Sequence, residues 1–73
     1  MTQSDRIAHL QGLAEHARMS HAYWLRNARQ GGCGAYGPAY CLAGAGIWRR
    51  RLGELLAQLR VAEAATRQTQ HTA

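Results

Sequence analysis

Apolar and small residues recur every three or four positions along residues 38–68, and this periodicity constrains the fold more than any other feature. Pro38 suits the first turn of a helix, where its missing N–H would have no partner anyway. The recurring positions are Cys41, Ala45, Trp48, Leu52, Leu55, Leu59 and Ala62. Such spacing is typical of a helix that packs lengthwise on another helix. At ~1.5 Å per residue this helix is roughly 45 Å long, so it needs an equally long partner.

The upstream segment, residues 5–30, supplies that partner. Its apolar and small positions are Ile7, Leu10, Ala14, Ala17, His21, Trp24 and Ala28. Thr2 or Ser4 can cap this helix, and Gly31-Gly32 can end it. We therefore predict an all-α fold, an antiparallel hairpin of helices over about 5–30 and 38–68. The chain forms one domain, 1–73, with frayed ends at 1–3 and 69–73.

The register of the hairpin follows from the two spacings, because opposing residues in an antiparallel pair have numbers that add up to a constant. A sum of 69 sets Leu10 against Leu59 and His21 against Trp48. Most layers then pair a large residue with a small one, as interdigitating helices require. A shift by one residue sets Trp24 against Gly44 and crowds the indole even less, so both registers stay open.

We call each row of recurring apolar and small residues a seam. The two seams alone give a small core for a chain of 73 residues. Further leucines flank each seam and widen its apolar stripe. We therefore predict a homodimer in which two hairpins form a four-helix bundle. The predicted core and dimer residues are Leu10, Leu13, Trp24, Leu25, Trp48, Leu52, Leu55, Leu56 and Leu59. The alternative is a monomer that leaves some of these leucines exposed.

Catalytic and metal-binding patterns are missing from the sequence. The carboxylates are Asp5, Glu15, Glu54 and Glu63, and none of them lies on a seam. There is no C-x-x-C pair, no nucleophile–base pattern and no phosphate-binding loop. We predict a non-enzyme without a metal or cofactor. Cys33 and Cys41 flank the turn and are expected to be free thiols, with a reversible disulfide across the loop as the alternative.

The expected location is the cytoplasm. The sequence starts without a basic segment followed by an apolar core, so no secretion signal is expected. The longest uncharged run, residues 30–48, is interrupted by several glycines and a proline, which argues against a membrane span.

A protein-binding surface is predicted near the turn. Tyr40, Ile47 and Arg51 lie on one side of the second helix, away from its seam. Exposed Tyr and Ile two turns apart, with Arg beside them, form a suitable set of interface anchors. The predicted partner-binding residues are Tyr36, Tyr40, Ile47, Arg50 and Arg51. Alternatively, Tyr40 and Ile47 pack against the other protomer.

A nucleic-acid surface is the rival hypothesis. The net charge is +5, and all nine basic residues are arginines. Arginines interleaved with aromatic residues suit phosphate contact and base stacking. The candidate contacts are Arg18, Arg26, Arg29 and Arg49.

The chain length, the two long helices and the turn GGCGAYGPAY, with Tyr40 at the start of the second helix, carry a family resemblance. In these features the chain resembles the small phage-encoded anti-quorum-sensing, anti-activator proteins, which are dimers of helical hairpins. The resemblance implies an inhibitor that covers the working surface of a host regulator, such as a DNA-binding transcription factor, in the host cytoplasm. Tyr40, Ile47 and the Arg cluster would then contact that regulator.

Overall fold

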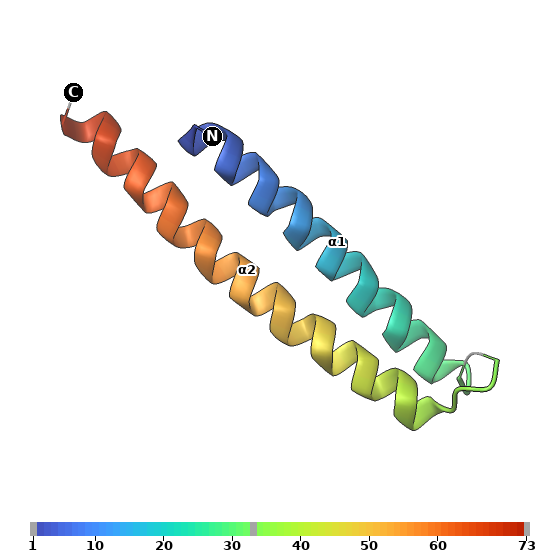
Figure 1. The fold of residues 1–73 in the computed structure, drawn as a ribbon. Helices are drawn as coiled ribbons and strands as arrows, with labels where there is room; N and C mark the ends of the chain where they lie inside the picture. The colour runs from blue at the N-terminus through green and yellow to red at the C-terminus, as the bar shows by residue number, and fades with distance from the viewer. Residues whose placement is uncertain (1, 33, 73) are drawn as a thin grey trace.

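The chain folds into two long helices that lie side by side in opposite directions (Figure 1). The structure is a computed structural model that describes residues 2–32 and 34–72, with side chains through residue 68. Helix α1 is Gln3–Arg29 and helix α2 is Pro38–Thr72. The molecule is a rod of 56 × 16 × 14 Å. The predicted all-α antiparallel hairpin is confirmed.

Helix α1 begins with a capping box at Thr2. The Thr2 hydroxyl oxygen accepts a hydrogen bond from the Asp5 N–H at 3.1 Å. The Asp5 carboxylate in turn accepts one from the Thr2 N–H at 3.4 Å. Two N–H groups that the first turn leaves without helical partners are thereby satisfied. Of the two caps that the sequence allowed, Thr2 is the one used, and α1 starts two residues earlier than expected.

Helix α1 ends at a pair of glycines. The Gly31 N–H donates to the Ala28 carbonyl at 3.2 Å, and the Gly32 N–H donates to the Asn27 carbonyl at 2.8 Å. This is the bonding pattern of a Schellman motif. Both glycines have positive φ, +92° and +109°, so the predicted left-handed stop is confirmed. Cys33 of the following loop lies outside the described residues.

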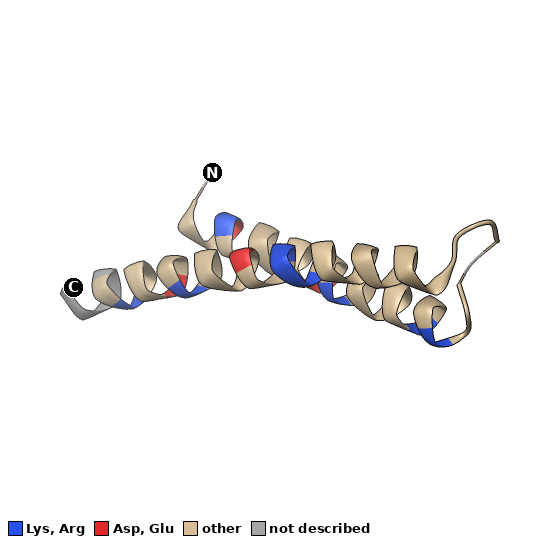
Figure 2. Ribbon diagram, turned by 90° about the horizontal axis from the view of Figure 1, so that it is seen from below, with Lys and Arg blue, Asp and Glu red and all other residues tan. Residues whose placement is uncertain are grey.

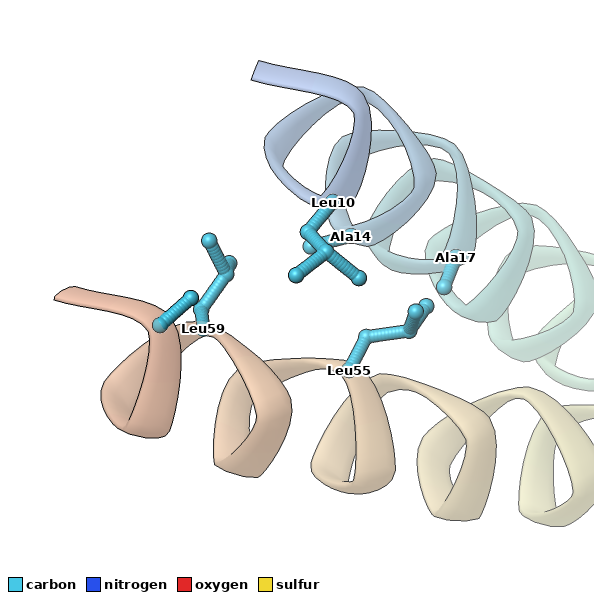
Figure 3. Close-up of a cluster of buried hydrophobic side chains, with 6 residues drawn as sticks. Leu10, Ala14, Ala17, Leu55 and Leu59 are labelled. Atoms are coloured by element: carbon cyan, nitrogen blue, oxygen red, sulfur yellow. The ribbon is translucent and has the colours of Figure 1, made fainter. Parts of the chain in front are cut away.

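The core follows the line where the two helices meet. Among the residues whose burial the structure describes, every buried one is a predicted seam position. This buried set is Leu10, Ala14, Ala17, Cys41, Ala45, Leu55, Leu59 and Ala62. Figure 3 shows Leu10 projecting from α1 toward Leu55 and Leu59 of α2. Ile7, Leu13, Trp48 and Leu52 pack around this cluster and are half-buried. Four of the eight buried residues are alanines, so the core is narrow.

Both tryptophans depart from the simplest pairing. A Cβ built on Gly44 would stand 3.0 Å from Cδ2 of Trp24, so the indole lies on Gly44, as in the register shifted by one. The ring of Trp48 meets His16 edge-on at 5.3 Å, and not His21, the seam partner expected from the sequence. Both indoles are half-buried. Each indole therefore lies at the edge of the core and is not among its fully buried side chains.

Helix α2 is longer than expected and runs past the start of α1 (Figure 1). The Gln3 side-chain amide donates to the Ala62 carbonyl at 2.9 Å, so the residues of α2 beyond this level extend past α1. The sequence predicted fraying from residue 69, whereas the helix continues through Thr72. Met1 and Ala73, also predicted to be frayed, lie outside the described residues.

Candidate protein-binding surface

Four aromatic rings form a continuous chain at the loop end of the hairpin. Tyr36 in the loop stacks on Tyr40 in the first turn of α2, with ring centroids 4.3 Å apart and planes 17° from parallel. Tyr40 meets Trp24 of α1 at 5.9 Å, and Trp24 meets Tyr23 edge-on at 5.6 Å. Offset-stacked and edge-on contacts of this kind are the favourable geometries for aromatic pairs. They hold the loop, α1 and α2 together at this end.

A groove of about 220 Å³ lies beside these rings. We call it the aromatic groove; it is lined by Trp24, Tyr40, Ala43, Gly44, Ile47 and Trp48. Gly44 forms part of its floor, because a residue without a side chain lets the Trp24 indole approach the backbone of α2. None of the lining residues is charged, so the groove suits an apolar side chain.

The predicted anchors around this groove are strongly exposed. The exposed fractions are 53% for Tyr36, 52% for Tyr40 and 58% for Ile47. None of these side chains belongs to the buried core. The structure therefore brings Tyr36, Tyr40 and Ile47 together on one surface, as the sequence predicted, and leaves them accessible to a partner.

The two predicted arginine anchors, Arg50 and Arg51, differ in ion pairing and in the direction in which they leave α2. Arg51 is exposed and forms an ion pair with Glu54 at 3.5 Å. Arg50 is exposed as well. Successive residues on a helix point about 100° apart, so the two arginines leave α2 in different directions. A partner seated in the aromatic groove can meet one of them at the rim without meeting both.

Sequence reasoning missed the contribution of the two tryptophans. Trp24 and Trp48 were expected only in the core, yet both line the aromatic groove. Tyr23, which extends the row of rings, was also missed as part of this surface. The spacing of the two tryptophans places them on the seams and gives no sign that they also line a groove. The one available signal was the large size of Trp24 compared with Gly44 and Ala45 opposite it.

A second groove, of about 450 Å³, lies nearer the middle of the hairpin. We call it the leucine groove; its lining consists of Gln11, Ala14, Glu15, Arg18, Leu52, Leu56 and Leu59. Leu56 and Ile47 are nine residues apart on α2, about half a turn out of phase, so the two grooves open on opposite faces. Leu56, predicted as core or dimer, is 41% exposed in the single chain. Leu13 and Leu25 are half-buried.

The arginines predicted to contact nucleic acid are all exposed, but they do not form one compact patch. Figure 2 shows the basic positions spread along both helices. Arg18 forms an ion pair with Glu15, whose hydrogen bond and negative charge raise the pKa of the Arg18 guanidinium. Arg26 and Arg29 lie in the last turn of α1, where positive charge favours the helix dipole.

Within residues 2–32 and 34–68, no three His, Cys, Asp or Glu side chains lie close enough together to hold a metal ion. Glu15 and Glu54 are engaged by arginines. Cys41 is a buried free thiol, and the alternative disulfide to Cys33 involves a residue outside the described part. Over the described residues, neither helix has a stretch long and apolar enough to cross a membrane.

Comparison of the chain with protein-family models, with curated proteins and with solved structures finds no match.

Proposed function

We propose that this chain is a non-enzymatic protein-binding module and that it holds its partner in the aromatic groove. One observation carries the proposal: Tyr36, Tyr40 and Ile47 gather on one accessible surface, and none of them takes part in the hairpin core. Tyr and Trp dominate the binding energy of protein interfaces because they combine a large apolar area with few rotatable bonds. Large apolar side chains clustered on a surface mark an interaction site more often than isolated ones do.

The chemistry of the groove indicates what its partner presents. The lining is apolar and uncharged, and the tyrosine hydroxyls can donate or accept hydrogen bonds. Arg50 and Arg51 follow Ile47 by three and four residues on α2, the spacing of neighbours on a helix surface. These features suit an apolar side chain carried on a helix, with acidic residues next to it. The net charge of +5 favours the approach of such an acidic surface.

The finer proposal concerns the consequence of binding. A small binding chain can inhibit its partner by occupying a surface that the partner needs. The resemblance to phage anti-activators suggests that this surface belongs to a DNA-binding regulator of the host, in the host cytoplasm. The chain would then be a stoichiometric inhibitor.

Affinity capture with matched variants tests the binding site. The full chain, tagged at one end, is used to capture proteins from cell extract alongside Tyr40→Ala, Ile47→Ala and Met19→Ala. Met19 is 63% exposed and lies outside both grooves, so its variant is the control. We expect Tyr40→Ala and Ile47→Ala to weaken partner binding about thirtyfold or more, seen as a loss of captured protein, since interface anchors contribute about 2 kcal/mol or more. Unchanged capture by Tyr40→Ala would contradict the assignment.

Inhibition is tested on the captured protein itself. If that protein binds DNA, we expect its DNA binding to fall in proportion to added chain, up to one chain per site. Undiminished DNA binding by a saturated complex would contradict the inhibitor proposal. It would not contradict the proposal that the chain is a protein-binding module.

The rival nucleic-acid function has weaker support, because its candidate arginines are dispersed and one of them, Arg18, is ion-paired with Glu15. It predicts an affinity for RNA or DNA that falls steeply as salt rises. A gel-shift series between low and physiological salt measures this. Tight, salt-sensitive binding to nucleic acid would favour the rival over the protein-binding proposal.

A further inference from the structure

A single hairpin leaves more surface exposed than a chain of this size normally does. Its accessible surface is 5503 Å², whereas a compact monomer of 8.0 kDa exposes about 4,450 Å². The radius of gyration, 16.5 Å, compares with about 11 Å for a globular chain of this length. The excess of about 1,000 Å² matches the roughly 800 Å² that each partner buries in a stable complex. A second protomer would remove it.

The position of the leucine groove favours a second copy of this chain over another occupant. From the bounds of α2, its midpoint falls at residue 55, next to Leu56. A two-fold axis at this point lets two copies of α2 overlap along almost their whole length. An axis at the aromatic groove, near the loop, would overlap one end only. Closed two-fold contacts of this kind are the commonest way in which identical chains associate.

The charges beside the groove are arranged to suit that axis. Leu42, Arg49, Leu56 and Glu63 follow one another at intervals of seven, so they form one stripe along α2. Arg49 stands seven residues before Leu56, and Glu63 stands seven residues after it. Both are exposed, and within the described part of the chain neither has an ion pair. When α2 is turned end over end about Leu56, each Arg49 therefore comes level with a Glu63.

We propose that the leucine groove is the interface of a homodimer in which two α2 helices run antiparallel across a two-fold axis at Leu56. Leu56 then packs against Leu56 of the partner subunit, and Arg49 pairs with Glu63 of the partner subunit on both sides of the axis. The axis is perpendicular to the helices, so the loops lie at opposite ends of the dimer. The two aromatic grooves face outward, which makes the dimer bivalent.

The first test measures molar mass by light scattering for three chains. We expect the unaltered chain to weigh about 16 kDa, twice the monomer mass of 8.0 kDa. Leu56→Glu sets two carboxylates against each other at the axis, and we expect dimerisation to weaken about a hundredfold, to a mass near 8 kDa. Ile47→Glu places the same change on the opposite face and should keep the dimer mass. A monomeric unaltered chain, or a dimer broken by Ile47→Glu and kept by Leu56→Glu, would overturn the proposal.

The second test is a charge swap. It tests the antiparallel pairing of α2 helices even if Leu56→Glu fails to fold. Arg49→Glu or Glu63→Arg alone turns both symmetric attractions into repulsions and should weaken dimerisation about tenfold or more. The double variant restores opposite charges at both positions and should restore dimerisation. Failure of the double variant to recover the dimer would refute the antiparallel register. The readout is mass alone, so this result stands apart from partner capture by the aromatic groove.

Discussion

The indole of Trp24 lies against Gly44, and a Cβ at that position would stand 3.0 Å from Cδ2 and 3.2 Å from Cε3 of the ring. This contact does two things at once. It sets how closely α1 approaches α2 near the loop, and it fixes one wall and the floor of the aromatic groove. The shape of the candidate site therefore depends on the absence of a side chain at one helical position.

Gly44→Ala should therefore lack the gain in stability that a helical glycine-to-alanine change usually brings. We expect it to be about 1–3 kcal/mol less stable than Gly12→Ala, because the added methyl forces the indole to move. Gly12 is also helical, and a methyl group added there would have nothing within 4 Å, so Gly12→Ala should gain up to about 1 kcal/mol. Urea unfolding of both variants measures the difference, and tryptophan fluorescence should shift only in Gly44→Ala. Equal stabilisation by the two changes would contradict the packing described here.

Gly32→Ala should cost more stability than Gly31→Ala. Gly32 has a φ of +109°, and a Cβ there would stand 2.1 Å from the Tyr36 carbonyl oxygen, which is backbone and cannot turn aside. Gly31 also has positive φ but has free space around it. We expect Gly31→Ala to cost about 1 kcal/mol from the left-handed conformation alone, and Gly32→Ala to cost clearly more. Thermal unfolding followed by circular dichroism ranks the two, and the reverse order would contradict the loop geometry.

Thr2→Ala should lower the free energy of unfolding by about 0.5–2 kcal/mol, because it removes the side-chain oxygen that accepts from the Asp5 N–H. Ser4→Ala is the natural control, since Ser4 was the other cap that the sequence allowed and it lies inside α1. That change should stay within about 0.5 kcal/mol. Chemical denaturation compares the two, and a larger loss for Ser4→Ala would place the start of α1 elsewhere.

Leu55→Ala tests the core. Leu55 is 1% exposed at the centre of the buried cluster, so its truncation should cost about 2–5 kcal/mol through lost burial and a cavity. Val61→Ala removes apolar atoms from the same helix at a residue that is 72% exposed, and it should change stability by less than about 0.5 kcal/mol. Similar losses for both would show that the seam does not form the core.

Much of this architecture is readable from the sequence because it depends on periodicity and local signals. The spacing of residues such as Leu10, Ala14 and Leu55 selects which side chains become buried, and Gly31-Gly32 marks the end of α1. The contacts of Trp24 with Gly44 and of Trp48 with His16 were not readable, because spacing alone leaves open which residue across the hairpin each indole meets. The end of α2 was also missed, since a polar composition does not by itself stop a helix.

The candidate site was readable only in part. Tyr40 and Ile47 stand out because they lie off the seam, and Tyr36 joins them through a stack that the loop creates. The pairing of Arg51 with Glu54 depends on side-chain placement that spacing alone allows but does not require. Spacing predicts which face of a helix a residue occupies, but not which neighbouring side chain it contacts there.

Photo-cross-linking from the lining of the aromatic groove tests the central claim most directly. A photoreactive phenylalanine derivative in place of Ile47 should, on irradiation in cell extract, yield a product whose mass equals the partner plus one 8.0 kDa chain. The same residue in place of Val61, exposed but outside both grooves, should yield little of that product. Cross-links from position 47 that join only two copies of this chain, or partner cross-links as strong from position 61, would contradict the account.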